Sequence, residues 1–111
     1  MLCFLSLALP AHAADTPADA GLAEVRDLGR LNGQALACSQ TEAAARIKAI
    51  MIKHAPKSRR YGEAFETTTN EEFLAQTRKD QAACQDGATL ASQVEEAATR
   101  LQAAVPATVS Q

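Results

Sequence analysis

Two cysteines, Cys38 and Cys84, follow an N-terminal segment that resembles a cleaved export signal, and this pair constrains the fold more than any other feature. An exported chain meets an oxidising compartment, where two such thiols form a disulfide. Closing a loop of about 47 residues stabilises a fold by about 4 kcal/mol in the chain-entropy account. The sequence therefore predicts a small domain held by one intramolecular disulfide. A bridge between two copies of the chain, which would make a dimer, is the alternative.

Residues 1–13 are predicted to be a signal peptide. The apolar run from Leu2 to Leu9 has the length of a signal hydrophobic region, and Ala11-His12-Ala13 matches the small-x-small pattern before a cleavage site. Cleavage is therefore expected before Ala14. A membrane-spanning helix needs about 20 apolar residues, so the run is too short to remain as an anchor. We expect a periplasmic or secreted protein; the alternative is a buried N-terminal helix.

The rest of the chain is predicted to be one all-α domain. Residues 14–20 suit a flexible leader, and residues 106–111 suit a tail that follows the last helix. Residues 21–105 carry apolar side chains at helical spacing and show no useful alternation of the strand type. The expected fold class is a small bundle of about four helices stapled by one disulfide.

The first and last helices have the clearest patterns. The first is expected from Leu22 to Cys38, and Gly29 and Gly33 lie on the edge of its apolar face, where another helix of the same domain can approach closely. A contact with a helix of a partner is the alternative. The last helix is expected over 88–105, after a turn at Asp86-Gly87. Its apolar stripe consists of Leu90, Val94, Ala97, Leu101 and Val105.

Two capping boxes are predicted to start the middle helices. Ser39 and Glu42 have the required spacing, and a helix that begins there should end before Pro56. Thr69 and Glu72 have the same spacing and predict a helix through about Gln85. A loop over 56–62 and a short helix over 63–68 are expected between them. The inward face of the first of these helices is predicted to contain Ala43, Ile47, Ile50, Met51 and His54.

Basic residues concentrate in one segment. No acidic residue lies between Glu42 and Glu63, whereas six of the eleven basic residues do. We expect a positive patch on an otherwise acidic body, in contact with an acidic protein or an anionic ligand. Guanidinium groups would bind the anion and a tyrosine would stack beside them. The predicted contact residues are Arg46, Lys53, Lys57, Arg59, Arg60 and Tyr61. The alternative is a solvated face that pairs with acidic neighbours in the same domain, which include Glu63, Glu66, Glu71 and Glu72.

Met51 and His54 give the only metal candidate. They lie one helical turn apart, and thioether and imidazole ligands suit copper, so copper handling is an alternative function. A histidine at the edge of the core, bonded to a carbonyl group, is the preferred interpretation. Below its ordinary pKa of about 6.5, a charged His54 would enlarge the positive patch. No other cofactor is expected.

No catalytic motif is recognisable. The sequence contains no Gly-rich phosphate loop, no H-E-x-x-H and no G-x-S-x-G, and the cysteines are not arranged as C-x-x-C. The net charge of −2 argues against a general nucleic-acid-binding protein. We therefore expect an exported, non-catalytic binding or accessory protein that neither spans a membrane nor binds nucleic acid. The sequence leaves the oligomeric state open.

A chaperone-like function is the remaining alternative. The chain is similar in broad style to small exported helical acid-stress chaperones, which also combine two cysteines with a short α domain. Their segment pattern does not map onto this chain residue by residue, so no site residue is carried over.

Overall fold

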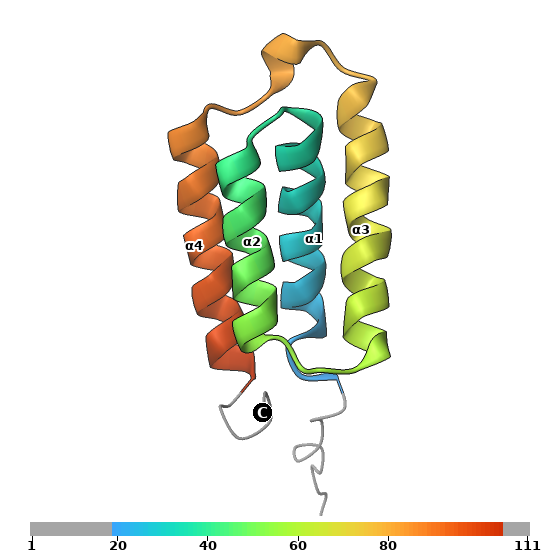
Figure 1. Cartoon of the computed structure of the whole chain (residues 1–111), viewed down its shortest axis with the longest axis vertical. Coiled ribbons are helices and arrows are strands. Elements are labelled where there is room, and N and C mark those ends of the chain that lie inside the picture. The colour runs from blue at the N-terminus through green and yellow to red at the C-terminus, as the bar shows by residue number, and fades with distance from the viewer. Residues whose placement is uncertain (1–18, 106–111) are drawn as a thin grey trace, which may run out of the picture.

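The computed structural model describes residues 19–105, and in this range the protein is entirely helical. It has four α-helices, one short 3₁₀ helix and no strand, which confirms the predicted all-α fold class. The elements, shown in Figure 1, are α1 (Leu22–Ala37), α2 (Thr41–His54), α3 (Arg59–Thr77), η3 (Gln81–Ala83) and α4 (Gly87–Ala104). The predicted signal peptide and tail, and residues 14–18 of the predicted leader, lie outside the described residues.

Helix α1 is central to the fold. It packs against each of the other three α-helices, and α2 also packs against α4, so α1 separates α3 from the α2–α4 pair (Figure 1). The predicted stripe of the last helix is confirmed, because all five of its members are buried. The largest fully buried side chains are Val25, Leu28, Ile47, Ile50, Leu90, Val94 and Leu101.

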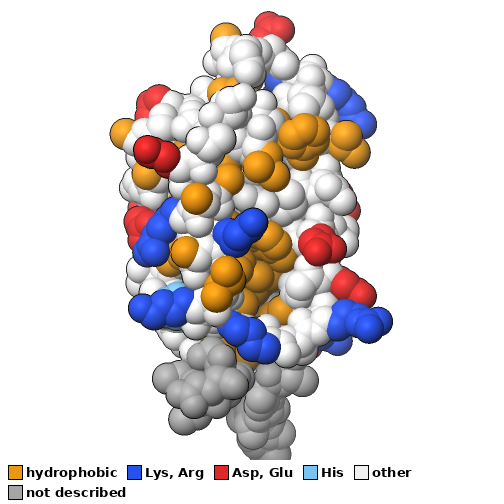
Figure 2. Space-filling model, in the orientation of Figure 1, with side chains coloured by type: hydrophobic (Ala, Val, Ile, Leu, Met, Phe, Trp, Pro, Cys, Tyr) orange, Lys and Arg blue, Asp and Glu red, His pale blue; other side chains and the backbone are white. Residues whose placement is uncertain are grey.

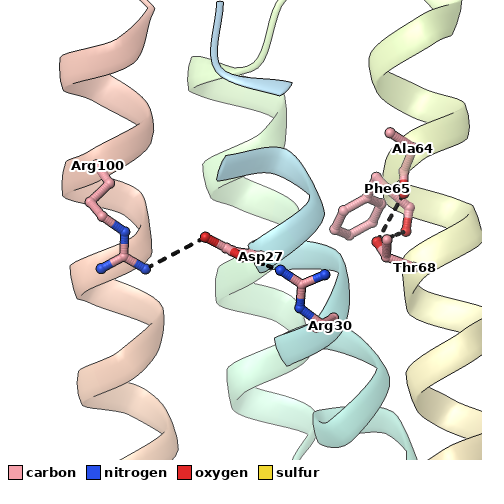
Figure 3. Close-up of polar contacts among 6 residues, drawn as sticks. All are labelled: Asp27, Arg30, Ala64, Phe65, Thr68 and Arg100. Carbon is pink, nitrogen blue, oxygen red and sulfur yellow. Dashed lines mark hydrogen bonds and ion pairs between the residues drawn. The ribbon is translucent and has the colours of Figure 1, made fainter. Parts of the chain in front are cut away.

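Two glycines allow α1 and α3 to approach closely. A Cβ atom on Gly29 would lie 1.8 Å from the hydroxyl oxygen of Thr68, and one on Gly33 would lie 2.5 Å from the carbonyl oxygen of Thr69. The Thr68 hydroxyl lies 2.9 and 3.2 Å from two carbonyl oxygens of its own helix (Figure 3). Asn32 of α1 donates to the Thr69 hydroxyl at 3.2 Å. The expected close contact within one domain is therefore confirmed.

An ion-pair cluster lies on another part of the α1 surface. Asp27 pairs with Arg30 on α1, and its second carboxylate oxygen lies 3.9 Å from Arg100 of α4 (Figure 3). All three side chains are at least partly exposed. Pairs of this kind contribute about 0 to 1 kcal/mol each, so they orient side chains more than they stabilise the fold.

The first predicted capping box is wrong. Ser39 has a φ of +59° and terminates α1 instead of starting α2, because its N–H donates to the Leu36 carbonyl and the Gln40 N–H donates to the Ala35 carbonyl. A left-handed residue followed by backward hydrogen bonds is a common helix C-terminus. The residue before α2 is Gln40, whose side chain donates to the carbonyl of Gln85 rather than to its own helix.

The second capping box is also wrong. Residues 59–77 form one continuous helix, so the predicted loop ends at residue 58 rather than at Gly62, and the predicted break at Thr69 does not occur. Thr69 lies in the middle of α3, and its hydroxyl accepts the hydrogen bond from Asn32. The close contact with α1 supports helical structure where local sequence favours a new start. The helix ends at Thr77 instead of Gln85, and η3 follows.

The predicted disulfide is confirmed. Cys38 and Cys84 are bonded, with Cα atoms 5.9 Å apart. Cys38 follows α1 directly, as expected, but Cys84 follows η3 rather than ending a helix. The disulfide therefore anchors the 78–86 connection to the end of α1. Gln85 strengthens this junction, because its amide nitrogen lies 2.8 Å from Gln34 Oε1 and 2.9 Å from Gln93 Oε1.

Candidate functional site

The predicted basic segment runs from Arg46 in α2 through the following loop to the first turn of α3. Its lysines and arginines are all exposed. They fall into two groups, because some have partners inside the domain and others do not. The difference decides which of them are available to another molecule.

Arg46 and Arg60 have internal partners. Arg46 donates to both carboxylate oxygens of Glu95 on α4, at 2.7 and 2.9 Å, and this hydrogen bonding lowers the pKa of Glu95. Arg60 lies 2.7 Å from Asp19, just before α1. The alternative of pairing inside the domain therefore holds for these two cations, but their partners are not the carboxylates expected from the sequence.

Lys57 has a structural contact. Its ammonium group donates to the carbonyl oxygens of Ile52 and Ala55, the latter at 2.9 Å. Carbonyl groups at a helix C-terminus lack partners within the helix, and a lysine beside them also complements the helix dipole. Lys57 thus stabilises the end of α2.

Three cations remain. Within residues 19–105, Lys48, Lys53 and Arg59 make no ion pair and no side-chain hydrogen bond. All three are exposed, two on α2 and one at the start of α3. They give the α2 side of the molecule a positive charge that the described acidic residues do not neutralise by direct contact.

Tyr61 is not available for the expected stacking on an anion. Only 4 % of its surface is exposed, and its hydroxyl donates to the Ala20 carbonyl at 2.9 Å. Burial is the main cause of a raised pKa for this phenol. Tyr61 is a core residue, and its hydrogen bond to Ala20 connects the start of α3 to the segment before α1. The stacking expectation was wrong because residues 59–62 are helical and turn this side chain inward.

An apolar groove lies beside one of these cations, Lys48. It has a volume of about 470 Å³ and is lined by Asn32, Leu36, Ala44, Ala45, Lys48, Ala49 and Ile52. Figure 2 shows hydrophobic side chains in a hollow at the centre of this face, with Lys and Arg side chains to its left and below it and Asp or Glu side chains to its right. Leu36 is 47 % exposed and Ile52 is 65 % exposed. We call this hollow the α1–α2 groove.

The sequence analysis missed this groove. Neither Leu36 nor Ile52 was among the predicted contact residues. A signal was present, since Ala44, Ala45, Ala49 and Ile52 give α2 a second apolar side beyond its inward stripe. The sequence did not show that this second side of α2 stays uncovered, because that depends on α3 packing against α1 and not against α2.

Met51 and His54 are both half-buried on the inward side of α2. Burial is the largest cause of a lowered pKa for His54, and the nearby charges of Lys53, Arg46 and Lys57 lower it further. These same cations would repel a bound copper ion. In the part of the chain that the structure describes, no three His, Cys, Asp or Glu side chains are grouped to hold a metal.

Comparisons with known proteins add no family. No protein-family model matches the chain, and no curated protein or solved structure shows significant similarity to it. None of the helices within residues 19–105 combines the length and apolar character of a membrane span. The unpaired cations and the neighbouring groove are therefore the features from which a function has to be argued.

Proposed function

We propose that the protein is an exported, non-catalytic binding protein that contacts an acidic partner through the basic surface of α2 and the start of α3. The observation that carries this proposal is the group formed by Lys48, Lys53 and Arg59. These exposed cations have no ion pair within residues 19–105, whereas Arg46 and Arg60 are paired. Unpaired like charges on one surface repel each other, and an acidic partner relieves that repulsion.

The export part of the proposal has two supports. Ala11-His12-Ala13 is a peptidase pattern behind a short apolar run, and the Cys38–Cys84 disulfide is typical of an oxidising compartment. Mass spectrometry of the protein recovered from its source cells tests this part. A mature chain that begins at Ala14 supports export, and a cytosolic chain that retains residues 1–13 contradicts it.

The binding part is tested by charge reversal. We expect Lys53→Glu/Arg59→Glu to reduce capture of the partner from source-cell extracts by about tenfold or more at low salt, because two attractive contacts become repulsive. High salt should reduce capture by the unchanged protein as well.

Arg78→Glu/Lys79→Glu is the matched control. These residues are also exposed cations without an ion pair within residues 19–105, but they lie just after the far end of α3. The two double variants have the same net charge, so only the position of the change differs. Equal capture by both would show that the α2 surface has no special role.

A further inference from the structure

We infer that the α1–α2 groove is the docking site for an amphipathic helix of a partner protein, with acidic side chains along the edge that faces α2. This inference rests on the proposed function and specifies the chemistry of the partner at the same surface. The apolar groove and the unpaired cations adjoin at Lys48, which is one of these cations and lines the groove on α2.

The shape of the groove suits a helix. Between Ala44 and Ile52, α2 lines the groove over about 12 Å, or roughly two helical turns. Three of the five α2 residues that line it are alanines, and short side chains allow a second helix to approach closely. An amphipathic helix binds such a groove with apolar residues spaced three and four apart.

The apolar contacts are available. Leu36 and Ile52 are far more exposed than large aliphatic side chains of a core, and they belong to two different helices of the same groove. A helix placed between them would cover both. Helix α3 does not fill this space, because it packs against α1 through Gly29 and Gly33 and makes no extensive contact with α2 (Figure 1).

The charges determine the orientation of the partner. Within residues 19–105, Lys48 is the only charged residue that lines the groove, and no carboxylate in this range lies within ion-pair distance of it. Lys53 adds a second cation to the α2 side. Acidic residues on the edge of the docked helix that faces Lys48 would neutralise it, whereas basic residues there would be repelled.

A protein helix fits this surface better than a membrane does. Apolar residues that bind lipid have to project into the acyl region, about 5 to 10 Å below the headgroups. The apolar lining here comes from two helices, α1 and α2, and forms a hollow rather than a surface that projects outward (Figure 2). Anionic vesicles therefore serve as an alternative ligand in the test.

The test uses the oxidised full chain and synthetic amphipathic helices of about 14 residues. One peptide has a leucine face and glutamates on one edge, and a second has lysines in place of the glutamates. We expect the glutamate peptide to shift the NMR methyl signals of Leu36 and Ile52, and to bind about tenfold more tightly than the lysine peptide.

Ile52→Glu is expected to weaken binding of the glutamate peptide about tenfold or more, because it removes apolar contact and adds a like charge. Leu74→Glu is the matched control, since Leu74 is 53 % exposed on α3, lies outside the groove and gives the same change in charge. Circular dichroism establishes that each variant folds. Ala49→Glu, at another exposed groove position, replaces Ile52→Glu if that variant does not.

Four outcomes would overturn the inference. In the first, both peptides bind equally well; in the second, Ile52→Glu and Leu74→Glu have equal effects on binding. In the third, the protein binds anionic vesicles but not the glutamate peptide. In the fourth, the groove is already occupied in the free protein. The last would appear as contacts from residues 2–9 or as a dimer dissociated by Ile52→Glu. If Lys53→Glu/Arg59→Glu abolishes partner capture while Ile52→Glu leaves it unchanged, the proposed function stands and the groove inference alone fails.

Discussion

At the scale of single residues, two glycines decide how α3 packs. A Cβ atom on Gly33 would meet the backbone of α3 at 2.5 and 2.7 Å, and backbone atoms cannot move aside as a flexible side chain can. The close approach of α1 and α3 therefore exists only because these positions have no side chain. Gly62 is different, since a Cβ atom there meets nothing within 4 Å.

We therefore predict that Gly33→Ala destabilises the protein by about 1 to 3 kcal/mol, the usual cost of overpacking. Gly62→Ala serves as the control and should be neutral or stabilising by up to about 1 kcal/mol, because alanine favours a helix more than glycine does. Urea unfolding of both variants measures the difference. A Gly33→Ala protein as stable as the unchanged one would show that the α1–α3 contact is not tight.

At the scale of whole elements, α4 is the helix that local sequence signals predict best. Asp86 precedes it, and its carboxylate accepts the N–H of Thr89 at 2.8 Å, as expected for an N-cap. This hydrogen bond favours the charged form of the carboxylate and so lowers the pKa of Asp86. The helix then follows its predicted stripe to Ala104, and it packs against α1 and α2.

Removing this cap should have a pH-dependent effect. Asp86→Ala is expected to lower the melting temperature at pH 7. Asp86→Ser should lower it much less, because a serine side chain can also cap the helix. Because the folded-state pKa is lowered, the contribution of Asp86 is present above its ordinary pKa of 3.8 and is lost as the pH falls through the folded value. Thermal melts of the three proteins at neutral and acidic pH measure this. If the melting temperatures of the unchanged protein and the Asp86→Ala variant diverge further towards low pH, the assignment is contradicted.

Helix α3 shows where local rules failed. Two turn signals, at Gly62 and at Thr69, fall within a helix that runs without a break from Arg59 to Thr77. Capping preferences contribute about 0.5 to 2 kcal/mol, and packing along a whole helix can exceed this. Tyr61 and Thr68 are buried in that packing, and Thr69 is bonded to α1. The tertiary contacts therefore override the local signals.

At the scale of the whole molecule, the disulfide connects the end of α1 to the part of the chain that the core holds least. Gln81, Ala82 and Ala83 are exposed, and η3 has no buried residue. The bond from Cys84 to Cys38 anchors this connection. The disulfide also lowers the conformational entropy of the unfolded chain, and in the entropic account this contributes more to stability than the anchoring does.

We predict that Cys38→Ser/Cys84→Ser lowers the free energy of unfolding by about 4 kcal/mol. The reduced wild-type protein should lose a similar amount, which separates the loss of the bond from the change of side chain. Urea unfolding with and without a reductant measures both. A loss below about 1 kcal/mol would show that the connection is held by other contacts, of which the Gln85 hydrogen bonds are the first candidates.

The sequence alone determined the helical class, the disulfide and the extent of α1 and α4, because these depend on the spacing of apolar residues, on two thiols and on a local cap. It also located the basic segment, but it could not show which of its cations are paired inside the domain and which are not. That Arg46 binds Glu95, that Tyr61 is buried, and that Leu36 and Ile52 share a groove were decided by the tertiary structure. Each depends on which helix lies beside which: α2 packs against α4, and the close approach at Gly29 and Gly33 places α3 against α1 and away from α2.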